Sequence, residues 1–390
     1  MGKYKLDDIF DLQMGKTPAR NNPVYWNDGC NAWVSIADLS NYSKYVNTTK
    51  ETISDVGVRE SGIKKVPNET VIMSFKLSLG KLAITTQPIY TNEAIMAFID
   101  KKIIDILPNY IFYLFSWMNW AEGTNKAVKG ITLNKSTLKN YEINVPPLPV
   151  QEKIADVLDR ANALIEKRKA QITKLDLLVK SQFVEMFGNI KENRYNFPVM
   201  ALHDVCNKIT DGKHSGCEGE FGSGYFFVGA REISNGNIQY DTAKEITASD
   251  FFESYRRCNI EIGDFVIVNT GATIGKTAIA VDSRTTRTLL QKSVALLKTK
   301  SEKLLPIFLQ YCYITNPAMY RVESASAQPN LLLSKIKATE IILPPLDMQI
   351  CFVNFVRHME VQKTQLKKSL ALLELNYKSL MQKCFKGEVQ

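Results

Sequence analysis

The sequence predicts an α+β chain in which two β-rich domains alternate with two long helices that pair as an antiparallel coiled coil, so that the chain is an approximate two-fold internal repeat. Three observations lead to this prediction: a proline-led helix opening that occurs twice, an apolar stripe along each helix, and looser matches between the segments before them. The predicted parts are a β-rich domain over residues 1–145, a helix over 146–188, a β-rich domain over 189–343 and a helix over 344–390.

The helix openings are the clearest repeat in the chain. Pro146-Pro147-Leu148 with Gln151 returns as Pro344-Pro345-Leu346 with Gln349, an offset of 198 residues from 146 to 344. The same offset still holds at Phe187 and Phe385. Because proline interrupts the element before it and suits the first turn of a helix, each proline pair predicts where a helix begins.

Both helices carry apolar residues at alternating spacings of three and four, the pattern of a coiled-coil seam. A stripe of about five heptads needs a helical partner, for which the other helix is the candidate. The alternative is that each helix packs only on its own domain. About 38 helical residues would make a rod of roughly 57 Å. Lys363 is the one charged residue of the second stripe. The predicted pairing residues are Ile154, Leu158, Ile165, Ile172, Leu175 and Val179, with Phe352, Val356, Leu366, Leu370, Leu373 and Tyr377.

The segments before the helices match more loosely. Val71–Ser74, followed by Gly80-Lys81, resembles Val266–Asn269, followed by Gly275-Lys276. Runs of β-branched residues that end in a glycine turn predict strand–turn–strand units. Further repeats pair Trp33-Val34 and Asp38 with Phe227-Val228 and Glu232, and short aromatic-rich helices are expected at Asn109–Asn119 and Pro306–Thr315.

The composition fits a cytoplasmic protein of two or three domains. The 390 residues are 45% hydrophobic, and the net charge of +9 is spread evenly, which permits nucleic-acid binding without requiring it. The N-terminus lacks the basic start, apolar run and small-residue cleavage site of a signal peptide, so secretion is not predicted. The most apolar segment, Ile103–Trp117, is too short to span a bilayer. Seven cysteines, an odd number without framework spacing, indicate reduced thiols.

Several short motifs suggest chemistry that their context does not support. Gly271–Thr277 resembles a phosphate-binding loop, but that loop needs a glycine where Thr270 stands, so an ATPase is not predicted. Asn22–Tyr25 resembles the Asn/Asp-Pro-Pro-Tyr loop of amino-methylating enzymes, but Val24 replaces its second proline. Phe221–Gly224 faintly resembles the glycine loop that holds S-adenosylmethionine, but no doubly wound strand–helix pattern surrounds it. Cys206, His214 and Cys217 lack a fourth zinc ligand at sensible spacing. We therefore predict no catalytic residue, metal or cofactor in this chain.

The predicted architecture suits a DNA-binding protein. Two similar domains on an antiparallel helix pair would share the local two-fold symmetry of DNA, whose successive major-groove faces lie about 34–36 Å apart. Loop side chains able to contact DNA are numerous, although each could instead be a solvated residue or a phosphate contact. The predicted DNA-binding residues are Lys16, Thr17, Arg20, Lys81, Asn134, Lys135, Lys213, His214, Arg231, Lys276, Arg284, Arg287, Gln328 and Asn330.

Over its full length the chain resembles the specificity subunit of type I restriction–modification systems. The resemblance is carried by Pro146–Gln151 and Pro344–Gln349, by Gly15–Pro18 and Gly271–Thr277, and by the duplicated domain–helix order. It implies two target recognition domains, 1–145 and 189–343, each reading one half of a split, asymmetric site on double-stranded DNA. The helices would be a molecular ruler and the docking surface for two modification subunits.

The resemblance also assigns the chemistry to other chains. The modification (methyltransferase) subunits would bring S-adenosylmethionine and methylate adenine, and restriction/translocase subunits would use ATP to move along DNA and cut it. Two alternatives stay open at this point. The chain could be a nuclease or methyltransferase with an unrecognised site, or a coiled-coil adaptor that never contacts DNA.

Overall fold

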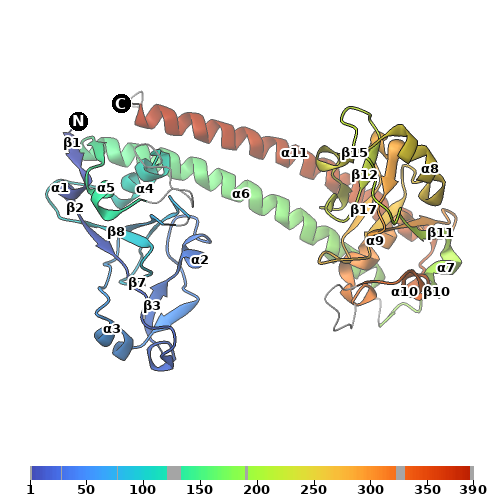
Figure 1. The fold of residues 1–390 in the computed structure, drawn as a ribbon, viewed down its shortest axis with the longest axis horizontal. Coiled ribbons are helices and arrows are strands. Elements are labelled where there is room, and N and C mark those ends of the chain that lie inside the picture. Colours follow the sequence, from blue (N-terminus) through green and yellow to red (C-terminus); the bar gives the residue numbers. More distant parts are fainter. Residues whose placement is uncertain are drawn as a thin grey trace. The chain divides into compact units, whose positions relative to one another are not determined.

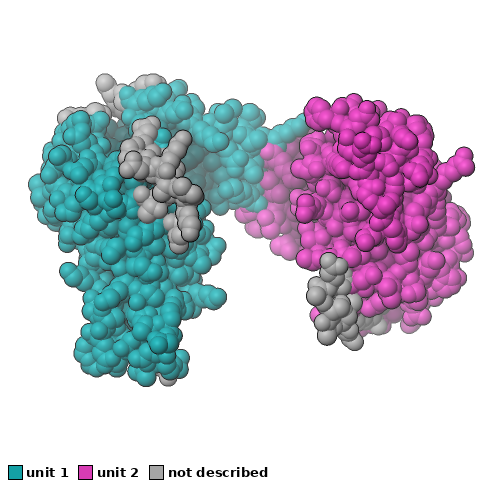
Figure 2. Space-filling model, in the orientation of Figure 1, with its two compact units in different colours: residues 1–169, 368–390 teal, residues 170–367 magenta. Residues whose placement is uncertain are grey.

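The computed structural model describes residues 2–27, 29–76, 78–120, 133–188, 192–321 and 330–386. Its two long helices are α6 (Leu148–Phe187) and α11 (Leu346–Phe385), each of 40 residues (Figure 1). Each begins directly after its proline pair, as the sequence predicted. The chain divides into two compact units, residues 1–169 with 368–390 and residues 170–367, so that both helices belong partly to each (Figure 2).

The first unit contains a four-stranded antiparallel sheet in the order β2-β8-β5-β6 and a three-stranded sheet in the order β4-β3-β7. A third pair joins the start of the unit to the strand before α6. The strands are β1 (Gly2–Lys5), β2 (Phe10–Met14), β3 (Asn31–Val34), β4 (Glu51–Ile53), β5 (Val71–Ser74), β6 (Leu82–Ile84), β7 (Tyr90–Thr91), β8 (Ile95–Asp100) and β9 (Glu142–Val145). The helices are α1 (Leu6–Ile9), η1 (Pro23–Tyr25), α2 (Ile36–Leu39), α3 (Asp55–Ser61), α4 (Pro108–Trp117) and α5 (Lys135–Lys139).

The second unit repeats these sheets in the orders β11-β19-β16-β17, β15-β12-β18 and β10-β20, and adds a small hairpin, β13-β14. Its strands are β10 (Val199–Ala201), β11 (Cys206–Asp211), β12 (Phe226–Val228), β13 (Ile233–Ser234), β14 (Asn237–Ile238), β15 (Lys244–Glu245), β16 (Phe265–Val268), β17 (Thr277–Ile279), β18 (Thr288–Leu290), β19 (Val294–Thr299) and β20 (Glu340–Ile342). Its helices are α7 (Leu202–Val205), η2 (Tyr240–Thr242), α8 (Ala248–Cys258), η3 (Ser283–Arg287), α9 (Pro306–Thr315), η4 (Pro317–Met319) and α10 (Leu333–Ala338).

These matching strand orders confirm the predicted fold class and internal repeat. A parallel strand pairing also recurs, between β3 and β7 and between β12 and β18. Gly271–Lys276 lies in the turn between β16 and β17, as predicted, with Gly275 at a φ of 88° that favours glycine, and Thr277 begins β17. No helix in the described ranges is long and apolar enough to cross a membrane.

The predicted seam is covered in both units. All twelve predicted pairing residues are buried or half-buried. In the first unit, Ile154 and Leu158 of α6 share a core with Met381 and Cys384 of α11 and with the strands of the domain. In the second, Val179 of α6 shares a core with Phe352 and Val356 of α11. The start of each helix thus packs on the end of the other, and the alternative of helices packed only on their own domains is wrong.

Lys363 is accommodated in this seam by two carboxylates. Its Nζ lies 2.6 Å from Asp176 of α6 and 3.3 Å from Glu360, one turn earlier in α11. Burial lowers the pKa of Lys363, but its hydrogen bonds to Asp176 and Glu360 and the negative charges of these two residues together outweigh burial, so the pKa is raised above its ordinary value. The charge is therefore kept at neutral pH.

The contacts of the repeated glutamine explain why the same distance separates the proline pair from the glutamine in both helix openings. The fully buried Gln151 accepts a hydrogen bond from Leu107 N (2.9 Å) and donates to the carbonyls of Asp105 and Pro146 (both 2.9 Å). Gln349 repeats all three contacts, with Leu305 N and the carbonyls of Lys303 and Pro344. Each glutamine fastens the start of its long helix to the uncapped start of α4 or α9.

Candidate nucleic-acid interface

A Gly-Lys pair follows the first strand of each four-stranded sheet. The lysine amide donates to a carbonyl of the neighbouring loop, Lys16 N to Thr91 O and Lys213 N to Leu290 O, both at 2.8 Å. A Cβ on Gly15 would lie 2.1 Å from Thr91 O, and one on Gly212 would lie 2.0 Å from Leu290 O. Only glycine fits at these two positions. Because a lysine follows each glycine and its amide makes the same hydrogen bond, the two lysines occupy equivalent positions on the two domains.

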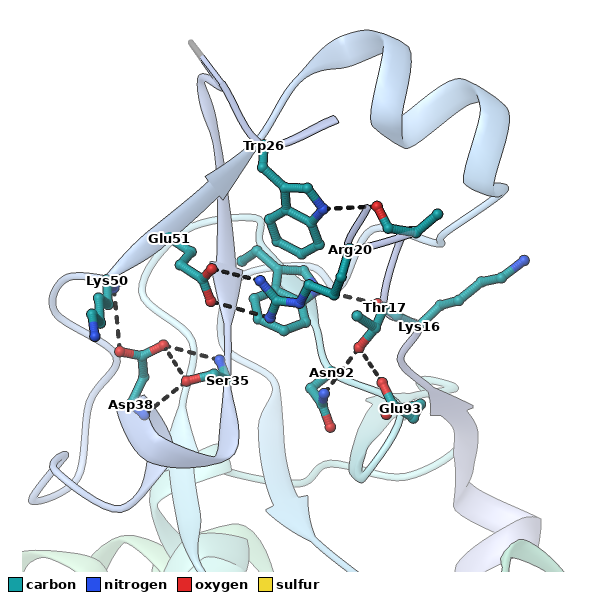
Figure 3. Close-up of polar contacts among 12 residues, drawn as sticks. Lys16, Thr17, Arg20, Trp26, Ser35, Asp38, Lys50, Glu51, Asn92 and Glu93 are labelled. Carbon is teal, nitrogen blue, oxygen red and sulfur yellow. Dashed lines mark hydrogen bonds and ion pairs between the residues drawn. The ribbon is translucent and has the colours of Figure 1, made fainter. Parts of the chain in front are cut away.

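The loop after Gly15 holds the first group of predicted DNA-binding residues (Figure 3). The Thr17 hydroxyl donates to Glu93 and accepts from Asn92 Nδ2 at 3.0 Å. The exposed Lys16 side chain reaches the carbonyl of Ser61 at the end of α3. These contacts fix the loop while leaving the lysine at the surface.

Arg20 is held between a carboxylate and two tryptophan rings. Its guanidinium carbon lies 3.9 Å from the ring centroid of Trp26 and 4.8 Å from that of Trp33, and both terminal nitrogens bond to Glu51. The side chain is still 49% exposed. Such a planar, immobilised guanidinium is suited to bidentate contact with a phosphate or a guanine edge, provided that Glu51 gives way.

An acidic residue follows both Trp33-Val34 and Phe227-Val228, and in each domain it anchors the adjacent loop. Asp38 accepts from the amide of Ser35 at 3.0 Å and from the amide of Lys50 at 3.2 Å (Figure 3). Glu232 likewise accepts from the amide of Gly229, at 2.8 Å. The sequence match between Asp38 and Glu232 therefore marks a shared structural contact.

Lys213 and His214 are engaged by acids of the second unit. Lys213 Nζ lies 2.6 Å from Asp250 on α8, and its side chain is only 12% exposed. The hydrogen bond to Asp250 raises the pKa of Lys213 against the effect of burial, and lowers the pKa of Asp250 in return. His214 lies 3.0 Å from Asp211, which also binds Arg257. The DNA-binding role of Lys213 and His214 stays a prediction that would require these pairs to open.

Arg284 resembles Arg20 in its surroundings. It pairs with Asp282 at 2.8 Å and Asp241 at 3.1 Å, and its guanidinium lies 4.8 Å from the centroid of the Tyr240 ring. The hydrogen bond to Asp282 raises its pKa above the ordinary range. Each domain thus presents an arginine fixed by an aromatic face and a carboxylate, but on different elements.

The remaining predicted residues fall into three groups. The exposed cations without an ion pair in the described part of the chain are Lys81, Lys135, Arg231, Lys276 and Arg287. Two polar residues make backbone or loop contacts: Asn134 caps α5 through Thr137 N at 2.7 Å, and Asn330 accepts from Thr270 Oγ1 at 3.2 Å. Gln328 lies outside the described residues. Lys81 and Lys276 occupy matching turns, between β5 and β6 and between β16 and β17.

Sequence reasoning missed two aromatic residues of these surfaces. Trp26 forms the platform under Arg20, and Phe221 is fully exposed in a loop with two left-handed glycines, Gly222 and Gly224. An aromatic residue beside such glycines is the signal that could have identified Phe221, because exposed aromatic rings stack on unpaired or end bases.

Within the described ranges, no group of three or more histidine, cysteine or acidic residues is placed to hold a metal. Cys206 is buried in the main core of the second unit, where burial raises its pKa to about 12. Cys217 packs on a different apolar cluster. These two cysteines and His214 do not form the zinc site considered from the sequence.

Comparison with known proteins gives consistent matches. The family described as "Type I restriction modification DNA specificity domain" matches residues 1–174 and again residues 196–374. The type I restriction enzyme MjaIX specificity subunit of Methanocaldococcus jannaschii is 30% identical over 187 residues, which are 47% of this chain and 43% of that protein. The matched part therefore spans less than half of that relative.

Two solved structures share the fold. A type I restriction–modification S subunit from M. genitalium aligns over 98% of this chain and 96% of its own, with a TM-score of 0.54 and 15% identity. A structure described as concerning complex assembly and conformational transition of the type I R-M system aligns over 98% and 97%, with a TM-score of 0.62 and 15% identity. At this identity the likeness concerns the fold alone.

Proposed function

Because this chain belongs to the family of type I restriction modification DNA specificity domains, we propose that it reads DNA for a type I restriction–modification complex. Each target recognition domain contacts one half of a bipartite, asymmetric site. The chain performs no catalysis itself, and it docks two modification subunits and the restriction subunits.

The observation that carries this proposal is a repeated scaffold with different side chains. Both domains have the same strand orders and the same Gly-Lys loop. However, Thr17 of the first loop corresponds to His214 of the second, and Lys16 is exposed where Lys213 is paired with Asp250. Equal scaffolds with unequal surfaces suit two half-sites of different base sequence.

Exposed apolar residues on the long helices support the docking role. Leu164 and Leu177 of α6 are 53% and 55% exposed, and Leu372 and Leu375 of α11 are 62% and 63% exposed. A subunit docked along these two helices would cover these leucines and remove their apolar surface from water.

The test is to co-express the chain with its neighbouring methyltransferase and to sequence host DNA for methylated adenine. We expect one split motif, modified in both halves. Exchanging residues 189–343 for those of a relative should change one half only. Adding one heptad to both α6 and α11 keeps the seam in register and lengthens each helix by about 10.5 Å. The number of unread base pairs between the two half-sites should therefore increase by about three.

A continuous motif, or a domain exchange that alters both halves, would contradict the modular proposal. The adaptor alternative is tested by measuring duplex binding at several salt concentrations. Contacts to phosphates make binding weaken steeply with salt, whereas an adaptor would show no salt-dependent, sequence-specific binding. Turnover by the isolated chain, with a divalent metal or with S-adenosylmethionine, would favour the enzyme alternative.

A further inference from the structure

The second unit contains an open apolar groove of about 1020 Å³. Its walls come from α9, from the β13–β14 hairpin, from residues 262–263, from the end of β17 and the segment after it, from Asp176 and Lys180 of α6, and from α11 as far as residue 363. The apolar residues that line it include Ile307, Ile314, Val281, Ile350, Val353 and Val361. Three of them are strongly exposed: Ile350 at 44%, Val361 at 59% and Val281 at 64%. A cluster of this kind on a surface indicates a binding site.

The internal repeat shows why the groove is open. In the first unit, Ile84 N donates to Lys44 O at 2.8 Å, and in the second, Ile279 N donates to Gly236 O at 3.2 Å. Lys44 and Gly236 thus occupy equivalent backbone positions beside the last strand of the four-stranded sheet. Gly236 has no side chain to cover the groove, and its left-handed φ of 77° disfavours one.

In the first unit the side chain of Lys44 fills the equivalent place. It is only 7% exposed, its ammonium pairs with Asp159 of α6, and it lies 4.6 Å from the centroid of the Tyr113 ring. The Tyr113 hydroxyl also bonds to Asp159. This surface of the first unit is therefore covered and neutralised by the chain itself.

The second unit has a tyrosine at the position equivalent to Tyr113, but a basic residue at the position equivalent to Asp159. At the offset of 198 residues, Tyr113 corresponds to Tyr311, and Asp159 corresponds to Arg357. Arg357 and Lys180 line the groove, are exposed and have no ion pair among the described residues. The other charges of the lining are Lys363, Asp176 and Glu360, which pair with one another. The available charges of the groove are therefore positive.

We propose that this groove binds an apolar segment of a modification subunit that presents a carboxylate to Arg357, in the place that Lys44 fills in the first unit. The inference rests on the proposed function, since it takes the modification subunit as the partner. It adds a prediction of asymmetry: the two modification subunits contact the two repeats differently, because only the second repeat leaves this groove open.

The test uses the full chain and the purified modification subunit encoded with it. Arg357→Glu should weaken binding of one of the two modification subunits at least tenfold, seen by native mass spectrometry as a complex with one subunit instead of two. Lys367→Glu is the matched control, because Lys367 is exposed on the same helix but does not line the groove. A photo-crosslinker at position 307 should label a segment of the modification subunit that contains Asp or Glu beside apolar residues.

Unchanged binding by Arg357→Glu, or crosslinks to DNA or to a second copy of this chain, would overturn the groove assignment while leaving the proposed function intact. A wild-type chain that binds no modification subunit would overturn both. Val361→Ser gives a second, uncharged test and should also weaken binding. Because Arg357 and Val361 are both exposed, unfolding temperatures close to that of the wild type are expected for both variants.

Discussion

The two buried glutamines of the helix openings give the sharpest prediction, because the chain contains the same network twice. Gln151→Ala removes hydrogen bonds to Leu107 N and to the carbonyls of Asp105 and Pro146, in a side chain with no solvent exposure. At a net value of about 1 kcal/mol for each bond, the loss is about 3 kcal/mol, and the buried groups left without partners add to it. Gln349→Ala should lose a similar amount.

The free energy of unfolding is measured by urea titration, followed by far-UV circular dichroism. Gln171→Ala and Gln365→Ala are the matched controls, since these glutamines are exposed on the same two helices, and each should change stability by no more than about 0.5 kcal/mol. Hydrogen exchange adds a local readout. Gln151→Ala should speed exchange in peptides containing Leu107 but not in those containing Leu305, and Gln349→Ala should do the reverse.

Equal stability of Gln151→Ala and Gln171→Ala would refute the reasoning, because the glutamine would then contribute nothing to holding the helix opening. Faster exchange at both helix starts in either variant would also count against it. That result would mean that the two networks are not independent local clamps.

Three further predictions concern the loop, the seam and the DNA-binding surface. Gly15→Ala should lower stability by about 1–3 kcal/mol in thermal unfolding, because its Cβ would lie 2.1 Å from a backbone carbonyl, whereas Gly216→Ala, with open space around it, should be near neutral. Lys363 has a raised pKa in the folded chain, so its stabilising contribution is complete below its ordinary pKa of 10.5 and is lost as the pH rises through the higher folded value. The stability difference between wild type and Lys363→Met should therefore shrink above about pH 10.5, and a constant difference would contradict this. Arg20→Ala should weaken duplex binding and reduce the slope of log K against log salt by about 0.9, while Arg20→Lys should keep the slope; an unchanged affinity in both variants would exclude a DNA contact at Arg20.

The elements that could be predicted from sequence are those that local chemistry decides. Proline pairs mark the start of α6 and α11 within two residues, since proline restricts the backbone where it stands. The alternating spacing of three and four predicts which residues of each helix form the seam, because helical geometry sets which residues share a face. All of these residues are buried or half-buried in the structure. The glycine turn before Lys276 likewise predicts the β16–β17 pair.

The roles of individual polar residues could not be predicted in the same way, since their partners lie far along the chain. Lys16 and Lys213 follow equivalent glycines, yet Lys213 alone meets a carboxylate, 37 residues away at Asp250. The repeated Gln151 was visible as a pattern, but its contact with Leu107 spans 44 residues and appears only when α4 packs on α6.

The sequence by itself therefore determined the repeat, the helices and the seam, because backbone restriction and side-chain periodicity act within a few residues. The tertiary structure decided the strand order, the ion pairs and the difference between the two halves. Gly236 stands where Lys44 stands in the other repeat, a match that the offset of 198 does not reveal because the intervening loops differ in length. Only packing brings Lys44 to Asp159, 115 residues away, and leaves Arg357 facing an open groove.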